Sequence, residues 1–422
     1  MQHARWAALG TLVGLGLWAG TATAQAPDYP LRHNDVVVFL GDSNTAGATF
    51  AKVIETFTLL RFSDRTITFL NAGVGSDTAT GGAQRLQRDV FDQGGTVVIV
   101  TFGINDILWG AAADEAHRQA YLDGIRSMLI ACRDHVPQVR VILNSYPLTG
   151  GQAGQTQPNA TQQFLHDMAL DAFAVAQQVG GDVLTIDVFA DMFDLFVNGR
   201  QTSPLWGDRP SMGDGIHLTP FGHQVWAWAM LRNMSVSPTV SSVTLNAAPL
   251  QVVATTNAIV SSLSAPSGRV EFTRLDGGLP MQFGAFQLAT PLLWMPFTQE
   301  LNQYLLKVTG LAAGTYAIDV DGKRIGQWTA AQLATGLNLG PDGSDPYWPK
   351  TPWGGKALVI NGLTDARRTL RVYGGLAGAF ASTDPNLDRA ETLIDVADHK
   401  TTAAQRNMRA PYGMRFVIMR VQ

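Results

Sequence analysis

Three short polar segments of the 422-residue chain contain the residue types that acyl transfer requires. Ser43 follows the apolar run VVVFL, Asn105 follows the apolar run VVIVTF, and Asp214 and His217 stand three residues apart. In acyl transfer a hydroxyl group attacks a carbonyl carbon, an imidazole takes the hydroxyl proton, and a carboxylate orients the imidazole. Ser43 is therefore a candidate nucleophile, His217 its base, and Asp214 the group that orients His217.

The same chemistry needs hydrogen-bond donors for the oxyanion that forms on the carbonyl oxygen. Candidate donors are the N–H of Ser43, a backbone N–H from Gly75 or Ser76 in the segment NAGVGSDT, and the amide of Asn105. Losing one such donor typically costs about 2.7–4 kcal/mol of transition-state stabilisation. Asp106, beside Asn105, is expected to fix this loop by hydrogen bonds.

Each segment alone also has an ordinary interpretation. Ser43 can simply begin a helix, a Gly-x-Asn-Asp segment is more often a turn, and Asp-Gly-x-His occurs in unremarkable loops. Their joint occurrence, in this order and at the ends of expected strands, favours the catalytic interpretation.

Strands and helices alternate from Asp35 to about Met234. Five apolar runs rich in β-branched residues predict strands, and the segments between them predict helices; the runs are VVVFLG, ITFLNAG, TVVIVTFG, VRVILNSYP and DVLTIDVF. This alternation predicts a parallel sheet with helices on both faces. Because ligands bind outside the carboxyl ends of such strands, the polar segments should converge on one rim. Thr219 and Pro220 are expected to start a helix that anchors the loop of His217.

The composition changes near residue 237 to segments with period-two alternation. LQVVATT, GRVEFTRL, YLLKVTGL and GTYAIDVDGKRIGQW predict strands, with an Asp-Gly turn at residues 321–322, and MRFVIMRV predicts a last strand. Helices are expected within residues 357–374 and 387–408. We therefore divide the chain into a signal peptide (1–24), a catalytic domain (30–235) and a C-terminal β-rich accessory domain with helical additions (240–422).

Residues 1–24 have the pattern of a secretory signal peptide. Arg5 lies in a short basic start, an apolar stretch follows, and Ala22 and Ala24 fit the A-x-A rule, which predicts cleavage after Ala24. The mature protein is then secreted or periplasmic and has no stable membrane span. The alternative is an uncleaved anchor helix.

Composition narrows the range of partners. A formal net charge of −4 gives no basic footprint for nucleic acid. The single cysteine, Cys132, allows no internal disulfide and no thiolate cluster, and it lies in an apolar helical pattern that predicts burial. The 8 histidines are scattered and form no H-E-x-x-H motif. We therefore expect no metal and no organic cofactor.

Three aromatic residues near the expected rim are candidate substrate contacts. They are Trp109 after Asn105, Tyr146 at the end of the fourth strand, and Trp206 on the loop before Asp214. Packing against neighbouring elements is the alternative for each. His223 is expected to be a surface or packing residue. The segment DPYWPKTPW (345–353) is expected to dock on its own sheet, with carbohydrate binding as the alternative.

Four segments resemble the conserved blocks of the SGNH hydrolases, also called GDSL esterases. They are FLGDSNTAG, NAGVGSDTATGGAQRL, VTFGINDILWG and GDGIHLTPFGHQVWA, and the resemblance covers about residues 35–234. It implies a three-layer α/β/α, flavodoxin-like fold, with Ser43 as nucleophile, Asn105 as oxyanion donor, and Asp214 and His217 completing the triad. Two positions depart from the family pattern. Asn44 stands where many members have Leu or Ile, and Ser76 stands where the donor glycine usually lies.

The sequence thus predicts an exported serine esterase that acts on small-molecule or polysaccharide esters, with acetyl groups on carbohydrate preferred. An O-acyltransferase or a lipase-like or lysophospholipase-like acylhydrolase would use the same triad. A carbohydrate-binding protein with an idle triad is the remaining alternative.

Overall fold

The computed structural model describes residues 29–150, 156–199, 211–283, 295–340, 350–378 and 385–421. Its first part contains the expected parallel sheet, in the strand order β2-β1-β3-β4-β5. This is the flavodoxin-like order, so the predicted fold class is confirmed. The strands are β1 (Val36–Gly41), β2 (Thr68–Gly73), β3 (Val97–Thr101), β4 (Arg140–Asn144) and β5 (Val183–Ile186).

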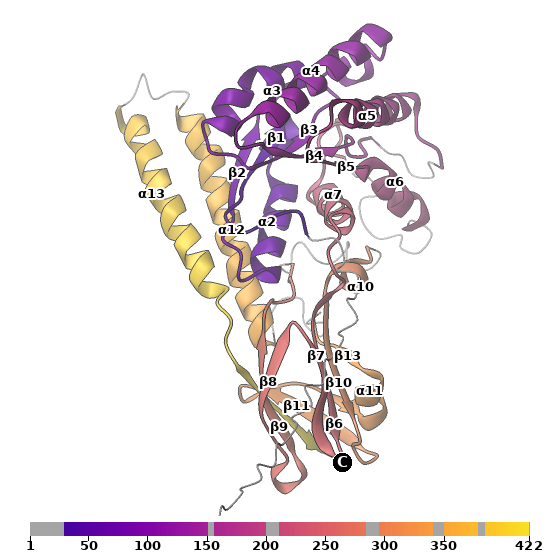
Figure 1. Ribbon diagram of the computed structural model, residues 1–422, viewed down its shortest axis with the longest axis vertical. Helices are drawn as coiled ribbons and strands as arrows, with labels where there is room; N and C mark the ends of the chain where they lie inside the picture. Colours follow the sequence, from indigo (N-terminus) through magenta and orange to yellow (C-terminus); the bar gives the residue numbers. More distant parts are fainter. Residues whose placement is uncertain are drawn as a thin grey trace, which may run out of the picture.

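Helices cover both faces of this sheet (Figure 1). Helices α3 (Ala79–Leu86), α4 (Glu115–Asp134) and α5 (Ala160–Val179) pack side by side on one face. Helices α2 (Thr49–Arg61), α6 (Val188–Gly199) and α7 (Pro220–Asn233) form the layer on the other. Three short helical turns lie between them: α1 (Ser43–Ala46), η1 (Gln87–Phe91) and η2 (Leu108–Gly110). Among the described residues, no helix is both long enough and apolar enough to cross a membrane.

The strand order places the candidate residues together. Strand β1 lies between β2 and β3 and pairs in parallel with both. The direction of the strand order reverses there, which is where open α/β sheets bind their ligands. Ser43 follows β1, the loop of Gly75 and Ser76 follows β2, and Asn105 follows β3.

The C-terminal part forms two further sheets with the strand orders β13-β10-β6-β7 and β12-β11-β14-β9-β8. Their strands are β6 (Thr239–Ala247), β7 (Leu250–Thr256), β8 (Ala258–Ser264), β9 (Val270–Asp276), β10 (Gln303–Thr309), β11 (Thr315–Val320), β12 (Lys323–Thr329), β13 (Leu337–Asn338) and β14 (Met414–Arg420). Short helical segments are η3 (Pro266–Gly268), α10 (Phe297–Leu301) and α11 (Ala330–Thr335). The β-rich character predicted from period-two alternation is thus confirmed, and Asp321 and Gly322 form the turn between β11 and β12.

Two long helices of the C-terminal part return to the first sheet. Helices α12 (Pro352–Gly378) and α13 (Pro385–Met408) pack against each other, and α12 packs on α2 beside the edge strand β2 (Figure 1). The contact contains a buried ion pair network. The carboxylate of Glu55 on α2 accepts hydrogen bonds from Arg367 and from Arg368, whose Nη2 lies 2.7 Å from Glu55 Oε2. Both helices were predicted from the sequence, but their docking on the catalytic sheet was not.

The Glu55 network makes the docking of α12 sensitive to one side chain. We expect Glu55→Gln to lower the free energy of unfolding by about 3–5 kcal/mol, because it leaves the buried Arg368 without its carboxylate and takes from Arg367 one of its two, Asp398 being the other. The measurement is urea denaturation followed by far-UV circular dichroism. Asp365→Ala is the control: it removes an exposed ion pair with Lys52 at the same interface, which is worth about 0–1 kcal/mol. Equal denaturation midpoints for Glu55→Gln and the wild type would contradict the expectation.

Candidate active site

Ser43 stands at a sharp turn from strand β1 into helix α1. Gly41 makes this turn possible, because a Cβ there would lie 2.2 Å from Thr45 Oγ1 and 2.6 Å from the carbonyl oxygen of Thr101. Asp42 is the N-cap of α1, and its Oδ1 accepts the N–H of Asn44 at 2.9 Å. Ser43 is therefore the first residue of the helix and is only partly buried. It both begins a helix and presents its hydroxyl at the rim.

Ser43, His217 and Asp214 form one line of hydrogen bonds. His217 Nε2 lies 2.9 Å from Ser43 Oγ, and His217 Nδ1 lies 2.6 Å from Asp214 Oδ2. These distances let the imidazole take the serine proton while the carboxylate fixes the ring orientation. The structure therefore brings together the three residues that the sequence proposes as a triad.

The loop of Asp214 and His217 is fixed by its own backbone. Asp214 Oδ1 accepts the N–H groups of Ile216 and His217 at 2.9 and 3.1 Å, and Gly215 turns the chain with φ of 72°. The hydrogen bond from His217, followed by that from Ile216, lowers the pKa of the Asp214 carboxyl below its usual value. Asp214 thus stays ionised beside the imidazole. Thr219 caps helix α7, as predicted, through its bond from the N–H of Gly222 at 3.0 Å.

Asn44 joins the turn that carries Ser43 (residues 41–44) to the loop that carries Asp214 and His217. Its Oδ1 accepts the N–H of Leu218 at 2.9 Å, and its Nδ2 donates to the carbonyl of Ile216 at 3.3 Å and to Tyr146 Oη at 2.9 Å. Tyr146 in turn donates to Asp42 Oδ2 at 2.8 Å. Asn44 therefore holds the residues on both sides of His217.

This network corrects the expectation for Tyr146. Its side chain is only 2% exposed, so it lies beneath the catalytic surface and supports the turn of Ser43 in place of a substrate contact. The end of a strand is a correct location for a rim residue, but the side chain of Tyr146 faces the interior. Trp206 lies outside the described residues.

Asn105 and the loop after β2 face the same rim. Asn105 Nδ2 donates to the carbonyl of Asp77 at 3.0 Å, and Asn105 Oδ1 accepts the indole N–H of Trp109 at 2.8 Å. The side-chain amide is therefore fixed in orientation, with Nδ2 as the donor end. Ser76 has φ of 61°, the left-handed conformation that favours glycine, at the position where the family usually has glycine. Gly75 and Ser76 are both exposed.

Four exposed apolar side chains lie on the loops that carry the candidate site residues. Leu108 and Trp109 are 59% and 57% exposed and both have positive φ, and Val74 and Met212 are 43% and 50% exposed. Three separate loops supply them, after β2, after β3 and before Asp214. Trp109 is therefore exposed beside Asn105 and orients its side-chain amide, and its role as a substrate contact stays a prediction.

Asp106 is buried next to Asn105 and anchors the start of helix α3. Its Oδ1 accepts the N–H of Ala79, the first residue of α3, at 2.9 Å, as the expected loop-fixing role requires. Its Oδ2 is buried and has no hydrogen-bond partner among the described residues. Burial raises the pKa of Asp106 to about 7, and burial likewise raises the pKa of Asp42 to about 6.

The remaining candidates are structural. His223 is buried and stacks on Phe50 and Trp226, and burial lowers its pKa to about 3, so it is a neutral packing residue. Cys132 is buried in the apolar core, as expected. Within the described ranges, no group of three or more His, Cys, Asp or Glu side chains is arranged to hold a metal ion.

Comparison with known proteins places this site in a family. Residues 39–225 match the model of the GDSL-like Lipase/Acylhydrolase family. A gut microbial diltiazem-metabolizing enzyme is similar in structure with a TM-score of 0.78, at 22% identity, over 94% of this chain and 99% of its own. An acetylxylan esterase from Geobacillus stearothermophilus has a TM-score of 0.40, at 18% identity, over 49% of this chain and 96% of its own.

Among curated proteins, the uncharacterized lipoprotein YqeF of Bacillus subtilis is 36% identical over 80 residues. This match covers 18% of the present chain and 32% of the lipoprotein, so the chain spans about a third of the length of this relative. Residues 39–225 form a GDSL-like lipase/acylhydrolase domain, and this part of the chain belongs to the SGNH hydrolases, a class of carboxylic ester hydrolases. The likeness to the diltiazem-metabolizing enzyme shows that the fold beyond this domain, through the C-terminal sheets, also occurs elsewhere.

Asn44 is the functional residue whose contribution the sequence did not reveal. We expect Asn44→Leu, which introduces the residue common in the family, to lower kcat/KM for p-nitrophenyl acetate by about 100-fold. The reason is that the His217 loop loses its bonds to the nucleophile turn, and a misplacement of about 1 Å has an effect of this size.

Tyr146→Phe is the matched control for Asn44→Leu. It removes one hydroxyl from the network and leaves both bonds between Asn44 and the loop. Its loss in kcat/KM should be smaller than that of Asn44→Leu, because the two hydrogen bonds it removes, from Asn44 and to Asp42, do not contact the His217 loop. A Leu variant as active as the wild type would show that Asn44 does not position His217.

The raised pKa of Asp106 predicts a pH-dependent stability. Between its unfolded value of about 3.9 and its folded value of about 7, the native state binds a proton that the unfolded state has lost, so this residue lowers stability as pH rises. Asp106→Asn removes the ionisation and keeps an acceptor for Ala79. The excess in unfolding free energy of Asp106→Asn over the wild type should grow by about 3 kcal/mol between pH 5 and pH 8, because about two units of this interval lie below the folded pKa and each is worth about 1.4 kcal/mol. Urea denaturation at four pH values measures it; a pH-independent difference would contradict the assignment.

Proposed function

We propose that the chain is an exported serine esterase that cleaves carboxylic esters through an acyl-enzyme. The observation that carries this proposal is the line of hydrogen bonds from Ser43 Oγ to His217 Nε2 at 2.9 Å and from His217 Nδ1 to Asp214 Oδ2 at 2.6 Å. A nucleophile, base and orienting carboxylate in this geometry are the parts that acyl transfer requires. Export is proposed from the pattern of residues 1–24, which lie outside the described residues.

In the first half of the reaction, Ser43 Oγ attacks the ester carbonyl while His217 Nε2 takes the hydroxyl proton. Asp214 stabilises the imidazolium that forms. The oxyanion is held by the N–H of Ser43, by a backbone N–H of Gly75 or Ser76, and by Asn105 Nδ2. His217 then gives its proton to the oxygen of the leaving alcohol as the ester bond breaks, which leaves the acyl group on Ser43.

In the second half, water takes the place of the alcohol. His217 removes a proton from the water, the hydroxide attacks the acyl carbonyl, and the proton returns to Ser43 as the carboxylic acid leaves. The fixed amide of Asn105 supports this proposal, because its orientation is set by Asp77 and Trp109 before substrate binds. Donors fixed in advance lower the reorganisation that the transition state needs.

For the substrate, we propose short acyl groups, acetyl in particular, on carbohydrate. The support is the β-rich C-terminal part joined to a predicted exported esterase. The exposed indole of Trp109, held beside Asn105, offers a flat apolar face of the kind that packs against a sugar ring. Release of acetate from acetylated xylan or pectin is the direct assay of this preference. Cleavage of long-chain esters together with no acetate release would overturn it.

The esterase proposal is tested by hydrolysis of p-nitrophenyl acetate and p-nitrophenyl octanoate. We expect the wild type to turn over both esters, with acetate preferred, and Ser43→Ala to lose at least about ten-thousand-fold in kcat, as loss of a triad nucleophile does elsewhere. Ser63→Ala, a serine outside the site, is the matched control and should retain activity. Equal rates for the wild type and Ser43→Ala would show that the triad is idle.

A further inference from the structure

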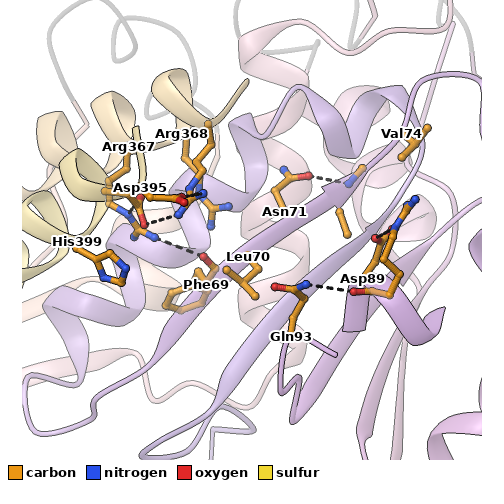
Figure 2. A pocket seen from close by; sticks show the side chains of 15 residues that line it. Phe69, Leu70, Asn71, Val74, Asp89, Gln93, Arg367, Arg368, Asp395 and His399 are labelled. Atoms are coloured by element: carbon orange, nitrogen blue, oxygen red, sulfur yellow. Dashed lines mark hydrogen bonds and ion pairs between the residues drawn. The ribbon is translucent and has the colours of Figure 1, made fainter. Parts of the chain in front are cut away.

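A polar trough of about 610 Å³ runs along the edge strand β2. Its floor is residues 69–74, one wall is α12 and α13, and the other wall is η1 with the turn after it (Figure 2). Its volume lies within the range of about 300–1,000 Å³ that is typical of small-molecule sites. The trough therefore exists only because the C-terminal helices stand beside the catalytic sheet.

The floor of the trough is closed to an added β-strand. Edge strands leave backbone groups unpaired and can bind an extended peptide. In β2, however, side chains of the chain itself already bond to some of these groups: Asn71 Oδ1 accepts the N–H of Gly73 at 2.8 Å. Arg367 Nη2 lies 3.5 Å from the Phe69 carbonyl. A peptide strand would have to displace both interactions.

The walls present paired charges. Arg371 bonds to Asp395 at 2.6 Å and to Asp398 at 3.1 Å, Arg367 also bonds to Asp398 at 2.7 Å, and Arg88 bonds to Asp89 at 2.5 Å. Figure 2 shows Arg367 and Asp395 together on one side of β2 and Asp89 and Gln93 on the other. Because each arginine lies beside a carboxylate, an anion meets the carboxylates and a cation meets the guanidinium groups. Neither gains a net attraction.

This lining selects a neutral ligand with many hydroxyl groups. A hydroxyl is the neutral group that both donates and accepts, so it can donate to an aspartate and accept from the neighbouring arginine at the same time. An apolar ligand would leave these groups without water or partners, at a cost. His399 and Gln93 add further exposed hydrogen-bonding groups on opposite walls.

The trough also points at the candidate site. Its floor ends at Val74, the residue before Gly75 and Ser76, which are candidate oxyanion donors. We infer that the trough binds the sugar chain of an acylated oligosaccharide and delivers an ester on that chain to Ser43. This inference rests on the proposed esterase function and deepens it, because it names where the carbohydrate lies.

The test compares an acetyl ester without a sugar chain and an acetyl ester on a sugar chain, with the ratio of the two in each variant referred to the wild-type ratio. The substrates are p-nitrophenyl acetate and acetylated xylooligosaccharide, and the variants are Asp395→Ala and the double variant Gln93→Ala/His399→Ala. We expect the ratio of kcat/KM for the oligosaccharide to kcat/KM for p-nitrophenyl acetate to fall about tenfold in each variant, mainly through a higher KM, which is the loss of about one charge-assisted hydrogen bond. Asp134→Ala removes an equally exposed carboxylate from an Arg–Asp pair on α4 and should leave the ratio unchanged.

The outcomes separate the two proposals. If the wild type does not cleave p-nitrophenyl acetate, the esterase proposal fails; if it does, and the trough variants leave the ratio unchanged, the inference about the trough fails. Calorimetric titration of Ser43→Ala with unacetylated xylohexaose should give binding that Asp395→Ala weakens. Binding of oligogalacturonate but not of xylohexaose would overturn the neutral class of ligand. Unchanged thermal midpoints in all variants exclude unfolding as the cause.

Discussion

The site depends on the missing side chain at Gly41. Any Cβ at this position would collide with Thr45 and with the backbone of Thr101, so only glycine lets α1 start directly against the end of β1. The positions of the next three residues follow from this close approach of α1 to β1. Asp42 caps the helix, Ser43 stands at its first position with the hydroxyl at the rim, and Asn44 reaches the His217 loop. One four-residue turn thus determines where the nucleophile lies and where its base is held.

The protein buries charge in two different ways, and the difference follows from function. Glu55 is paired with two arginines, so its burial is compensated and the pair fixes α12 on α2. Asp42 and Asp106 lie beneath the site with hydrogen bonds but no cation bonded to them, and burial raises the pKa of both. Acidic groups of this kind reduce stability at neutral pH. They are placed where they hold the N-terminal turns of α1 and α3, which carry the nucleophile and follow the oxyanion loop.

The local parts of the structure could be predicted from sequence, and the long-range parts could not. Apolar runs fixed the strands, and the short spacing of Asp214 and His217 made their pairing visible because both lie in one loop. Because ligands bind outside the carboxyl ends of parallel strands, the sequence placed Tyr146 near the site. It gave no information on the direction of the Tyr146 side chain, which is buried. The bonds of Asn44 to Ile216 and Leu218, and those of Glu55 to Arg367 and Arg368, join residues far apart in the chain. No local pattern in the sequence signals such contacts. Asn44 was visible only as a departure from the family pattern, in which many members have Leu or Ile.

The C-terminal part is bound to the same helices that position the triad. Helix α2 follows the nucleophile turn, and the Leu60 carbonyl near its end accepts the N–H of Leu279 at 2.8 Å. Helix α7 follows the His217 loop, and its Trp228 donates to Glu300 of α10 at 3.0 Å. A single hydrophobic core runs from Phe39 and Trp226 in the first part to Leu306 and Phe416 in the second. The C-terminal part therefore covers apolar surface that α2 and α7 would otherwise expose to water, and the helices that follow the Ser43 turn and the His217 loop are packed from both sides.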